Sequence, residues 1–189
     1  MPVLLVVIAS TRPGRVGLPV GQWFVAEAEK HGGFSVVVAD LKELALPMMD
    51  EPHHPRLQKY TKEHTQQWSA LVGAADAVVF VMPEYNFSIT APLKNAIDFL
   101  FTEWNYKAAG LVSYGGMSGG VRAQQMVKQV LTSVRMMPLA ESVAIPFVSQ
   151  YVKDGVFTPP DIVVESAQMM LDELVKWADA LDPLRRPGA

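Results

Sequence analysis

Two arginines three residues apart stand in a loop whose composition suits a phosphate. The segment reads Ser10-Thr11-Arg12-Pro13-Gly14-Arg15-Val16-Gly17, between an apolar run and a helical pattern. Its hydroxyls and guanidinium groups donate hydrogen bonds, its glycines permit close backbone approach, and the N-terminus of the following helix favours negative charge. A capped turn with solvated arginines accounts for the same residues, so this loop alone leaves both interpretations open. It contains neither a Gly-x-x-x-x-Gly-Lys-[Ser/Thr] nor a Gly-x-Gly-x-x-Gly motif, which argues against a nucleoside-triphosphate loop and a Rossmann dinucleotide site.

Two further segments combine residue types that suit a flat, heteroaromatic ligand. The segment Pro83-Glu84-Tyr85-Asn86-Phe87-Ser88 offers backbone groups to a ring edge, with Tyr85 and Phe87 placed to pack beside the ring face. The alternative is a plain turn with two core aromatics. The segment Tyr114-Gly115-Gly116-Met117-Ser118-Gly119-Gly120 is dense in glycine, which indicates close backbone approach or positive φ, unless the segment is a flexible surface loop.

Reactive side chains of the usual kinds are scarce. The chain has no cysteine, which excludes thiol nucleophiles, disulfides, iron–sulfur clusters and cysteine-ligated zinc. His53 and His54 stand between two prolines without a histidine pair at helical spacing, so we expect surface residues rather than metal ligands. The position of Glu84 requires no general-base role. We therefore predict no metal site and no catalytic side chain, and any reactive group would be a bound cofactor.

The elements that must position these segments alternate between strands and helices. Most of the strand candidates are continuously apolar, as in a parallel sheet that is covered on both faces. The predicted strands are Val3–Ala9, Ser35–Ala39, Ala77–Pro83, Gly110–Tyr114 and Glu141–Ile145, and the predicted helices span residues 16–31, 56–75, 91–101, 121–134 and 161–181. This order predicts an α/β fold, a doubly wound five-stranded parallel sheet with helices on both faces. Ligands of such sheets bind beyond the carboxyl ends of the strands, where the three segments stand.

Length and charge limit the remaining possibilities. The chain of 189 residues suits one domain, which we place at residues 1–182, followed by a frayed tail at 183–189. The net charge of −3 shows no basic excess for nucleic acid, and no apolar run is long enough to span a membrane. The first apolar run lacks the flanking features of a signal peptide, so we expect a cytoplasmic protein.

Taken together, the three segments resemble the NADPH-dependent FMN reductase family, which has a flavodoxin-like fold. Its first loop reads roughly Gly-Ser-x-Arg-x-x-Arg/Ser, where this chain has Ala9-Ser10-Thr11-Arg12-Pro13-Gly14-Arg15. Its most diagnostic stretch, Pro-Glu-Tyr-Asn-x-Ser and then Leu-Lys-Asn-Ala-Ile-Asp, corresponds to residues 83–88 and 93–98. Two positions depart from the family pattern. Ala9 replaces a glycine, and Phe87 stands where many members have glycine. An aromatic residue at that position resembles the quinone- and chromate-reducing branch of the family.

The resemblance implies a flavin site and a reaction. The FMN phosphate would be held by Ser10, Arg12, Arg15, Val16 and Gly17, and the ring would be lined by Pro83, Glu84, Tyr85, Asn86 and Phe87 on one side and by Tyr114, Gly115 and Gly116 on the other. NADPH or NADH would pass a hydride to FMN, and electrons would then go to a small-molecule acceptor such as free flavin or a quinone. A homodimer or homotetramer is implied too, with Phe101, Trp104 and Tyr106 as contact candidates.

Two other functions fit the same fold. A flavodoxin-like electron carrier would bind FMN without its own NAD(P)H activity, but such carriers are typically far more acidic than a net charge of −3. A phosphoacceptor signalling domain needs acidic residues after the first strand and an aspartate after the third, and this chain has neither.

Overall fold

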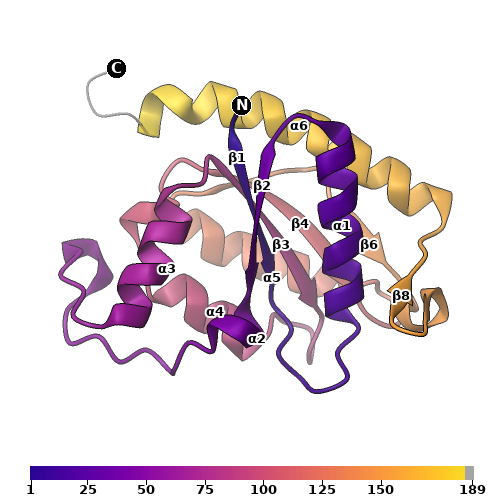
Figure 1. Ribbon diagram of the computed structural model, residues 1–189, viewed down its shortest axis with the longest axis horizontal. Coiled ribbons are helices and arrows are strands. Elements are labelled where there is room, and N and C mark those ends of the chain that lie inside the picture. Colours follow the sequence, from indigo (N-terminus) through magenta and orange to yellow (C-terminus); the bar gives the residue numbers. More distant parts are fainter. Residues whose placement is uncertain (186–189) are drawn as a thin grey trace.

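A parallel sheet forms the centre of the molecule (Figure 1). In the computed structural model, which describes residues 1–185, strands β1 (Val3–Ile8), β2 (Ser35–Asp40), β3 (Ala77–Pro83) and β4 (Ala108–Tyr114) lie in the order β2-β1-β3-β4. Two short strands, β5 (Met137–Pro138) and β6 (Val143–Ile145), pair with successive parts of β4 and share the fifth position. The order 2-1-3-4-5 is that of flavodoxin-like folds and confirms the predicted fold class.

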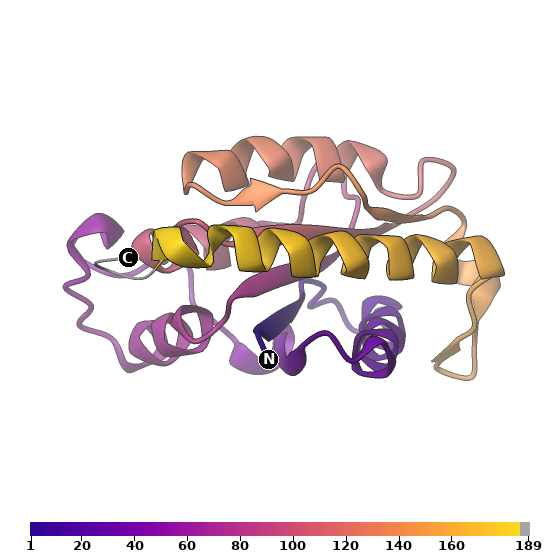
Figure 2. The same ribbon diagram turned by 90° about the horizontal axis from the view of Figure 1, so that it is seen from above.

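Helices cover both faces of this sheet. They are α1 (Gly17–His31), α2 (Leu41–Leu44), α3 (Glu63–Gly73), α4 (Ala91–Asp98), α5 (Val121–Ser133) and α6 (Asp161–Arg185). One core layer packs α1 and α6 against the sheet, and a second packs α3, α4 and α5 against its other face. Figure 2 shows α1 and α5 on opposite sides of the sheet.

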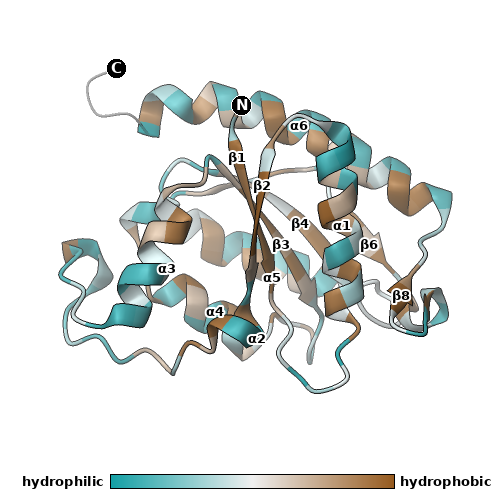
Figure 3. Ribbon diagram, viewed as in Figure 1, coloured by the Kyte–Doolittle hydropathy of each residue, from teal (hydrophilic) through white to brown (hydrophobic). Residues whose placement is uncertain are grey.

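The central strands β1, β3 and β4 are predominantly apolar because neither of their faces meets water. Every residue of β3 and β4 is buried, and Figure 3 shows the central strands as predominantly hydrophobic. Continuous apolar runs are expected of parallel strands with helices on both faces. The predicted strands therefore agree with β1, β2 and β3 to within one residue, whereas β4 begins two residues earlier than predicted and the fifth strand is split in two.

Two helix boundaries differ clearly from the sequence prediction. The helix expected at 56–75 begins only at Glu63, because the Glu51 carboxylate accepts hydrogen bonds from the backbone N–H groups of Thr61 and Lys62 and keeps that segment extended. Helix α4 ends at Asp98 rather than at residue 101, and Thr90 caps its start, its hydroxyl accepting from the Leu93 N–H. Short 3-10 helices at Pro55–Leu57, Thr102–Trp104 and Val148–Tyr151, helix α2, and a hairpin of β7 (Val152–Lys153) and β8 (Val156–Phe157) were not predicted.

The C-terminal segment is more ordered than predicted. Helix α6 continues through Pro183 to Arg185, so residues 183–185 of the expected frayed tail are helical. The Arg185 guanidinium donates to the carbonyls of Tyr106 and Ala178, which fixes this last turn against the sheet. The rest of that tail, residues 186–189, lies outside the described residues. Among residues 1–185, no helix is both long enough and apolar enough to cross a bilayer.

One of the three aromatic residues expected at a subunit contact is buried inside the chain. Trp104 is fully buried, and its indole N–H donates to the carbonyl of Ile97 at 3.1 Å. Its ring meets Trp68 edge-on at 5.8 Å between centroids. Phe101 packs beneath the Arg56 guanidinium, 4.3 Å from the ring centroid. The expectation that Trp104 is exposed was wrong, because its polar atom has an internal acceptor and its ring completes the core.

Replacing Trp104 with phenylalanine should lower the free energy of unfolding by roughly 2 kcal/mol, since the smaller ring leaves a void and the Ile97 carbonyl loses its side-chain donor. Urea unfolding followed by circular dichroism measures this loss. The matched control is Trp177→Phe on α6, whose side chain is 39% exposed and whose replacement should change stability little. Equal losses in the two variants would contradict this account of Trp104.

Candidate active site

Three loops meet at the carboxyl edge of the sheet. They follow β1, β3 and β4, which are neighbours in the sheet, and they enclose a cavity of about 150 Å³. The lining residues are Ser10, Arg12, Arg15, Val16, Pro83, Glu84, Tyr85, Tyr114, Gly115 and Val148. All but Val148 were expected from the sequence. Val148 was missed because it lies beyond β6, outside the three segments that the sequence singled out.

The four remaining predicted site residues, Gly17, Asn86, Phe87 and Gly116, do not line this cavity. Gly17 is buried behind it at the start of α1, whereas Phe87 is 66% exposed and turned outward. The backbone N–H groups of Asn86 and Gly116 donate to no other group in the described part of the chain. These two residues therefore present N–H donors rather than side chains.

Two buried hydroxyls converge behind the first loop. Ser10 and Tyr114 are nearly inaccessible, and neither hydroxyl oxygen has a hydrogen-bond partner among residues 1–185. A Cβ added to Gly17 would lie 2.1 Å from the Tyr114 hydroxyl and 2.2 Å from that of Ser10, so only glycine fits there. Burial raises the pKa of Tyr114 to about 12. Tyr114 therefore remains a protonated hydrogen-bond donor at neutral pH.

Helix α1 begins beside these hydroxyls without a side-chain cap. Its N-cap residue is Val16, and no acidic residue occupies its first turn. The first N–H groups of a helix have no intrahelical acceptor, and they carry a partial positive charge. The start of α1 therefore adds backbone donors to the two hydroxyls at one corner of the cavity.

The two arginines of the first loop differ in their surroundings. Arg15 forms a two-pronged ion pair with Asp40 at the end of β2, both N···O distances being 2.5 Å, and also donates to the Ser10 carbonyl. Burial disfavours ionisation of Asp40, but hydrogen bonds from Arg15 and from the Lys42 N–H outweigh it and lower the Asp40 pKa. Arg12 is exposed and forms no ion pair or hydrogen bond with the described residues. The sequence predicted the same role for both arginines, but only Arg15 is paired with a carboxylate, that of Asp40.

The turn after β3 holds an aromatic side chain in an unusual backbone conformation. Tyr85 and Ser88 exchange two backbone hydrogen bonds of 2.9 Å, and Asn86 and Phe87 between them have φ values of 49° and 67°. Two successive positive φ angles are the geometry of a type I′ turn. The Phe87 ring lies under the Arg122 guanidinium, 4.3 Å from the centroid. Phe87 therefore lies outside the set of residues that line the cavity, whereas Tyr85 lines it.

Glu84 joins the second loop to the third. Its carboxylate accepts from the Ser118 hydroxyl at 3.0 Å and from the Arg122 N–H and guanidinium at 3.1 and 3.0 Å. Burial disfavours the charged form of Glu84, but these hydrogen bonds prevail and lower its pKa. The Glu84 side chain thus fixes the cavity walls, and only its backbone and stem are left to face a ligand. Ser118 and Arg122 were not singled out from the sequence, because the pairing joins residues far apart in the chain.

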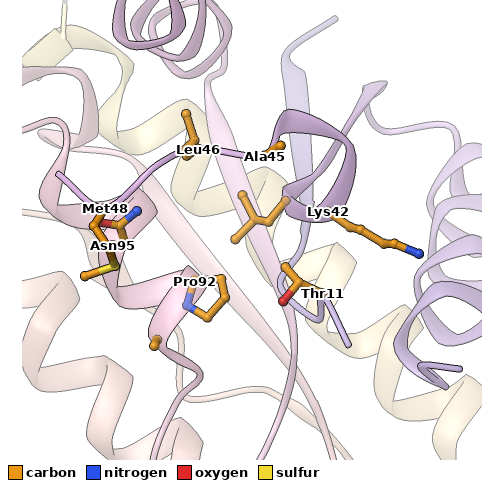
Figure 4. A pocket seen from close by; sticks show the side chains of 9 residues that line it. Thr11, Lys42, Ala45, Leu46, Met48, Pro92 and Asn95 are labelled. Atoms are coloured by element: carbon orange, nitrogen blue, oxygen red, sulfur yellow. The ribbon is translucent and has the colours of Figure 1, made fainter. Parts of the chain in front are cut away.

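A larger cavity of about 420 Å³ lies on the other side of the first loop (Figure 4). Thr11, Lys42, Met48 and Pro92 are among its lining residues. Asn95 shapes it, donating to the Pro47 carbonyl and accepting from the Met49 N–H, which fixes the segment after α2. No feature of the sequence indicated this cavity, and its polar groups are fewer than those of the three-loop cavity.

Three of the four histidines make contacts within the chain. The His54 ring accepts from the Arg56 N–H and caps the 3-10 helix Pro55–Leu57. His64 lies 2.9 Å from the Asp50 carboxylate, and His31 lies 3.0 Å from that of Asp172. Within residues 1–185, no group of three or more histidine or acidic side chains is placed to hold a metal ion.

Comparison with known proteins agrees with this geometry. The family model described as NADPH-dependent FMN reductase matches residues 2–150. An NAD(P)H-dependent FMN reductase of Schizosaccharomyces pombe is 36% identical over 160 residues, covering 84% of this chain and 80% of that protein. An NAD(P)H:quinone oxidoreductase of Solanum tuberosum is 51% identical over 59 residues, or 30% of each chain. The structure of FerB, a flavoenzyme NAD(P)H:(acceptor) oxidoreductase from Paracoccus denitrificans, shares the fold, with a TM-score of 0.75 at 23% identity over 95% of this chain and 98% of that one.

Replacing Glu84 with glutamine should lower the free energy of unfolding at neutral pH by about 1–2 kcal/mol, because charge-assisted hydrogen bonds to Ser118 and Arg122 become neutral ones. Since the folded-state pKa of Glu84 lies below its usual value of 4.5, its contribution is complete well above pH 4.5 and is lost as the pH falls through the folded-state pKa. The difference between wild type and variant should therefore shrink on acidification.

Urea unfolding at a series of pH values tests this expectation. Glu173→Gln is the control, since its partner Lys176 is a surface residue and such pairs contribute little. A gap between wild type and Glu84→Gln that stayed constant from neutral to acid pH would show that the carboxylate charge does not hold the loops together.

Proposed function

This chain belongs to the NADPH-dependent FMN reductase family, and on that basis we propose that the cavity between its three loops binds FMN. The family uses FMN and NAD(P)H, and the enzyme is an NAD(P)H-dependent FMN reductase. The residues present fit the cofactor. The observation that carries the assignment is the pair of buried hydroxyls, Ser10 and Tyr114, without partners beside the uncapped start of α1.

The phosphate end is proposed to lie at the first loop. A phosphate monoester carries close to two negative charges and accepts several hydrogen bonds. The Ser10 and Tyr114 hydroxyls, the first N–H groups of α1 and the free guanidinium of Arg12 are donors of the required kind. Gly17 is needed because any larger residue would displace both hydroxyls. The electrostatic attraction between protein and FMN is thus directed at the phosphate and not at the ring.

The flavin ring is proposed to lie between the second and third loops. Pro83, Tyr85 and Gly115 line that part of the cavity, and the N–H groups of Asn86 and Gly116 are free to meet polar atoms at a ring edge. The Glu84 carboxylate holds the two walls at a fixed separation. These residues bind and orient the ring, which is the usual division of work between protein and cofactor.

FMN, when bound, supplies the capacity to take a hydride from NAD(P)H and to pass electrons onward. We infer that the acceptors are small molecules such as quinones, supported by the likeness to the Solanum tuberosum NAD(P)H:quinone oxidoreductase. Neither Tyr114 nor Glu84, among the described residues that line the cavity, is placed to act as a base, because Tyr114 stays protonated and the Glu84 carboxylate is held by Ser118 and Arg122. We also expect the homodimer or homotetramer and the cytoplasmic location implied by the resemblance.

The purified protein, reconstituted with FMN, should oxidise NADPH or NADH in the presence of a quinone such as menadione. Absorbance of the reduced nicotinamide measures the rate, with each nucleotide tested separately. A protein that acquires the flavin spectrum but does not oxidise either nucleotide would be an electron carrier instead. Failure to bind FMN and to oxidise NAD(P)H would overturn the proposal.

Replacing Arg12 with alanine should weaken FMN binding by about ten- to a hundredfold, the range expected for one charge-assisted hydrogen bond. Riboflavin, which lacks the phosphate, should bind both proteins equally, and quenching of flavin fluorescence measures both affinities. Lys30→Ala, at the opposite end of α1, removes one positive charge away from the cavity and serves as the control. Equal weakening for FMN and riboflavin would place the effect outside the phosphate.

A further inference from the structure

The ion pair between Arg15 and Asp40 adjoins the proposed phosphate site. Arg15 lines the three-loop cavity, and its side chain is only 7% exposed. One nitrogen of its guanidinium donates to both the Ser10 carbonyl and Asp40, and the other donates to the second Asp40 oxygen. The guanidinium is therefore held in place before any ligand arrives, with its charge balanced by a carboxylate 14% exposed.

This arrangement alters the electrostatics of the loop. Two arginines near a phosphate would attract it strongly, but a carboxylate in contact with one of them cancels much of that attraction. Glu43 lies near enough to Arg15 to add to this effect in the same direction. Of the two cationic side chains, only Arg12 then offers an unbalanced charge.

Asp40 also has a second, purely structural contact. It is the N-cap residue of α2, where its side chain accepts from the Lys42 N–H at 3.0 Å. That contact needs an oxygen acceptor but no charge, because asparagine and serine are equally good N-cap residues. The charge of Asp40 and its capping role can therefore be separated by substitution.

We propose that Asp40 is a positioning residue that sets how tightly the phosphate end of FMN is held, by orienting Arg15 and cancelling its charge. The proposal rests on the proposed function, namely that the three-loop cavity binds FMN. With the Asp40 carboxylate present, FMN binds loosely enough to dissociate between turnovers. Without the negative charge of Asp40, FMN binds more tightly and dissociates less readily.

The test uses Asp40→Asn, with Asp40→Ser as a second variant that also keeps a cap for α2. Both should bind FMN roughly tenfold more tightly than the wild type at low ionic strength, and the gain should shrink in high salt. Riboflavin affinity should stay unchanged. Asp98→Asn, which removes a carboxylate from an exposed pair with Lys94, is the charge-matched control and should leave the FMN affinity as it is.

Thermal stability gives an independent readout. Without Asp40, the buried Arg15 lacks a counter-charge, so the FMN-free variants should melt at a lower temperature than the wild type. FMN should then raise the melting temperature of the variants by more than it raises that of the wild type, because the phosphate supplies the missing counter-charge. Riboflavin should produce no such extra rise.

The outcomes separate this proposal from the one on which it rests. FMN binding by the wild type, combined with equal or weaker FMN binding by the folded Asp40 variant, would overturn the role of Asp40 alone. A tighter affinity for both FMN and riboflavin would overturn it as well, because the effect would not act through the phosphate. A wild-type protein that bound neither flavin would overturn the proposed function and this proposal with it.

Discussion

Parallel hydrogen bonding in the sheet obliges β1, β3 and β4 to end at the same edge. Each of these strands is buried on both faces, and the chain leaves the sheet at that edge in loops. The buried N–H and C=O groups of those loops need hydrogen-bond partners. Some partners are the ends of neighbouring strands: the Glu84 N–H donates to the carbonyl of Tyr114 in β4, and the Gly115 N–H donates to that of Ile145 in β6. The groups that remain without partners mark the surface offered to a ligand.

Two carboxylates stiffen this edge, and neither is placed for acid–base chemistry. Glu84 bonds the second loop to the start of α5, and Asp40 bonds the first loop to the end of β2. Both are largely buried, and in both the partners outweigh the effect of burial and keep the carboxylate charged. The cavity walls are thereby connected to one another as well as to the sheet. A preorganised cavity of this kind loses less entropy when it binds a ligand.

The sequence was informative where structure depends on local pattern. Continuous apolar runs predicted the strands, and the position of the three loops after β1, β3 and β4 followed from the parallel arrangement. It was uninformative where distant residues meet. No residue near Arg15 in the sequence indicates its ion pair with Asp40, and none near Glu84 indicates its ion pair with Arg122. Trp104 was misplaced for the same reason, because the acceptor that permits its burial belongs to α4. The late start of α3 likewise depends on Glu51, ten residues earlier than the segment it holds.

Helix α6 gives the fold a particular order of assembly during synthesis. It follows every strand of the central sheet in the chain, yet it supplies Leu171, Leu174 and Ala178 to the core layer that it shares with α1. While a ribosome adds its 25 residues, for about one to five seconds, part of that apolar face has no cover. A nascent chain of this protein thus exposes a hydrophobic sheet face to chaperones and to other nascent chains until α6 has emerged and packed.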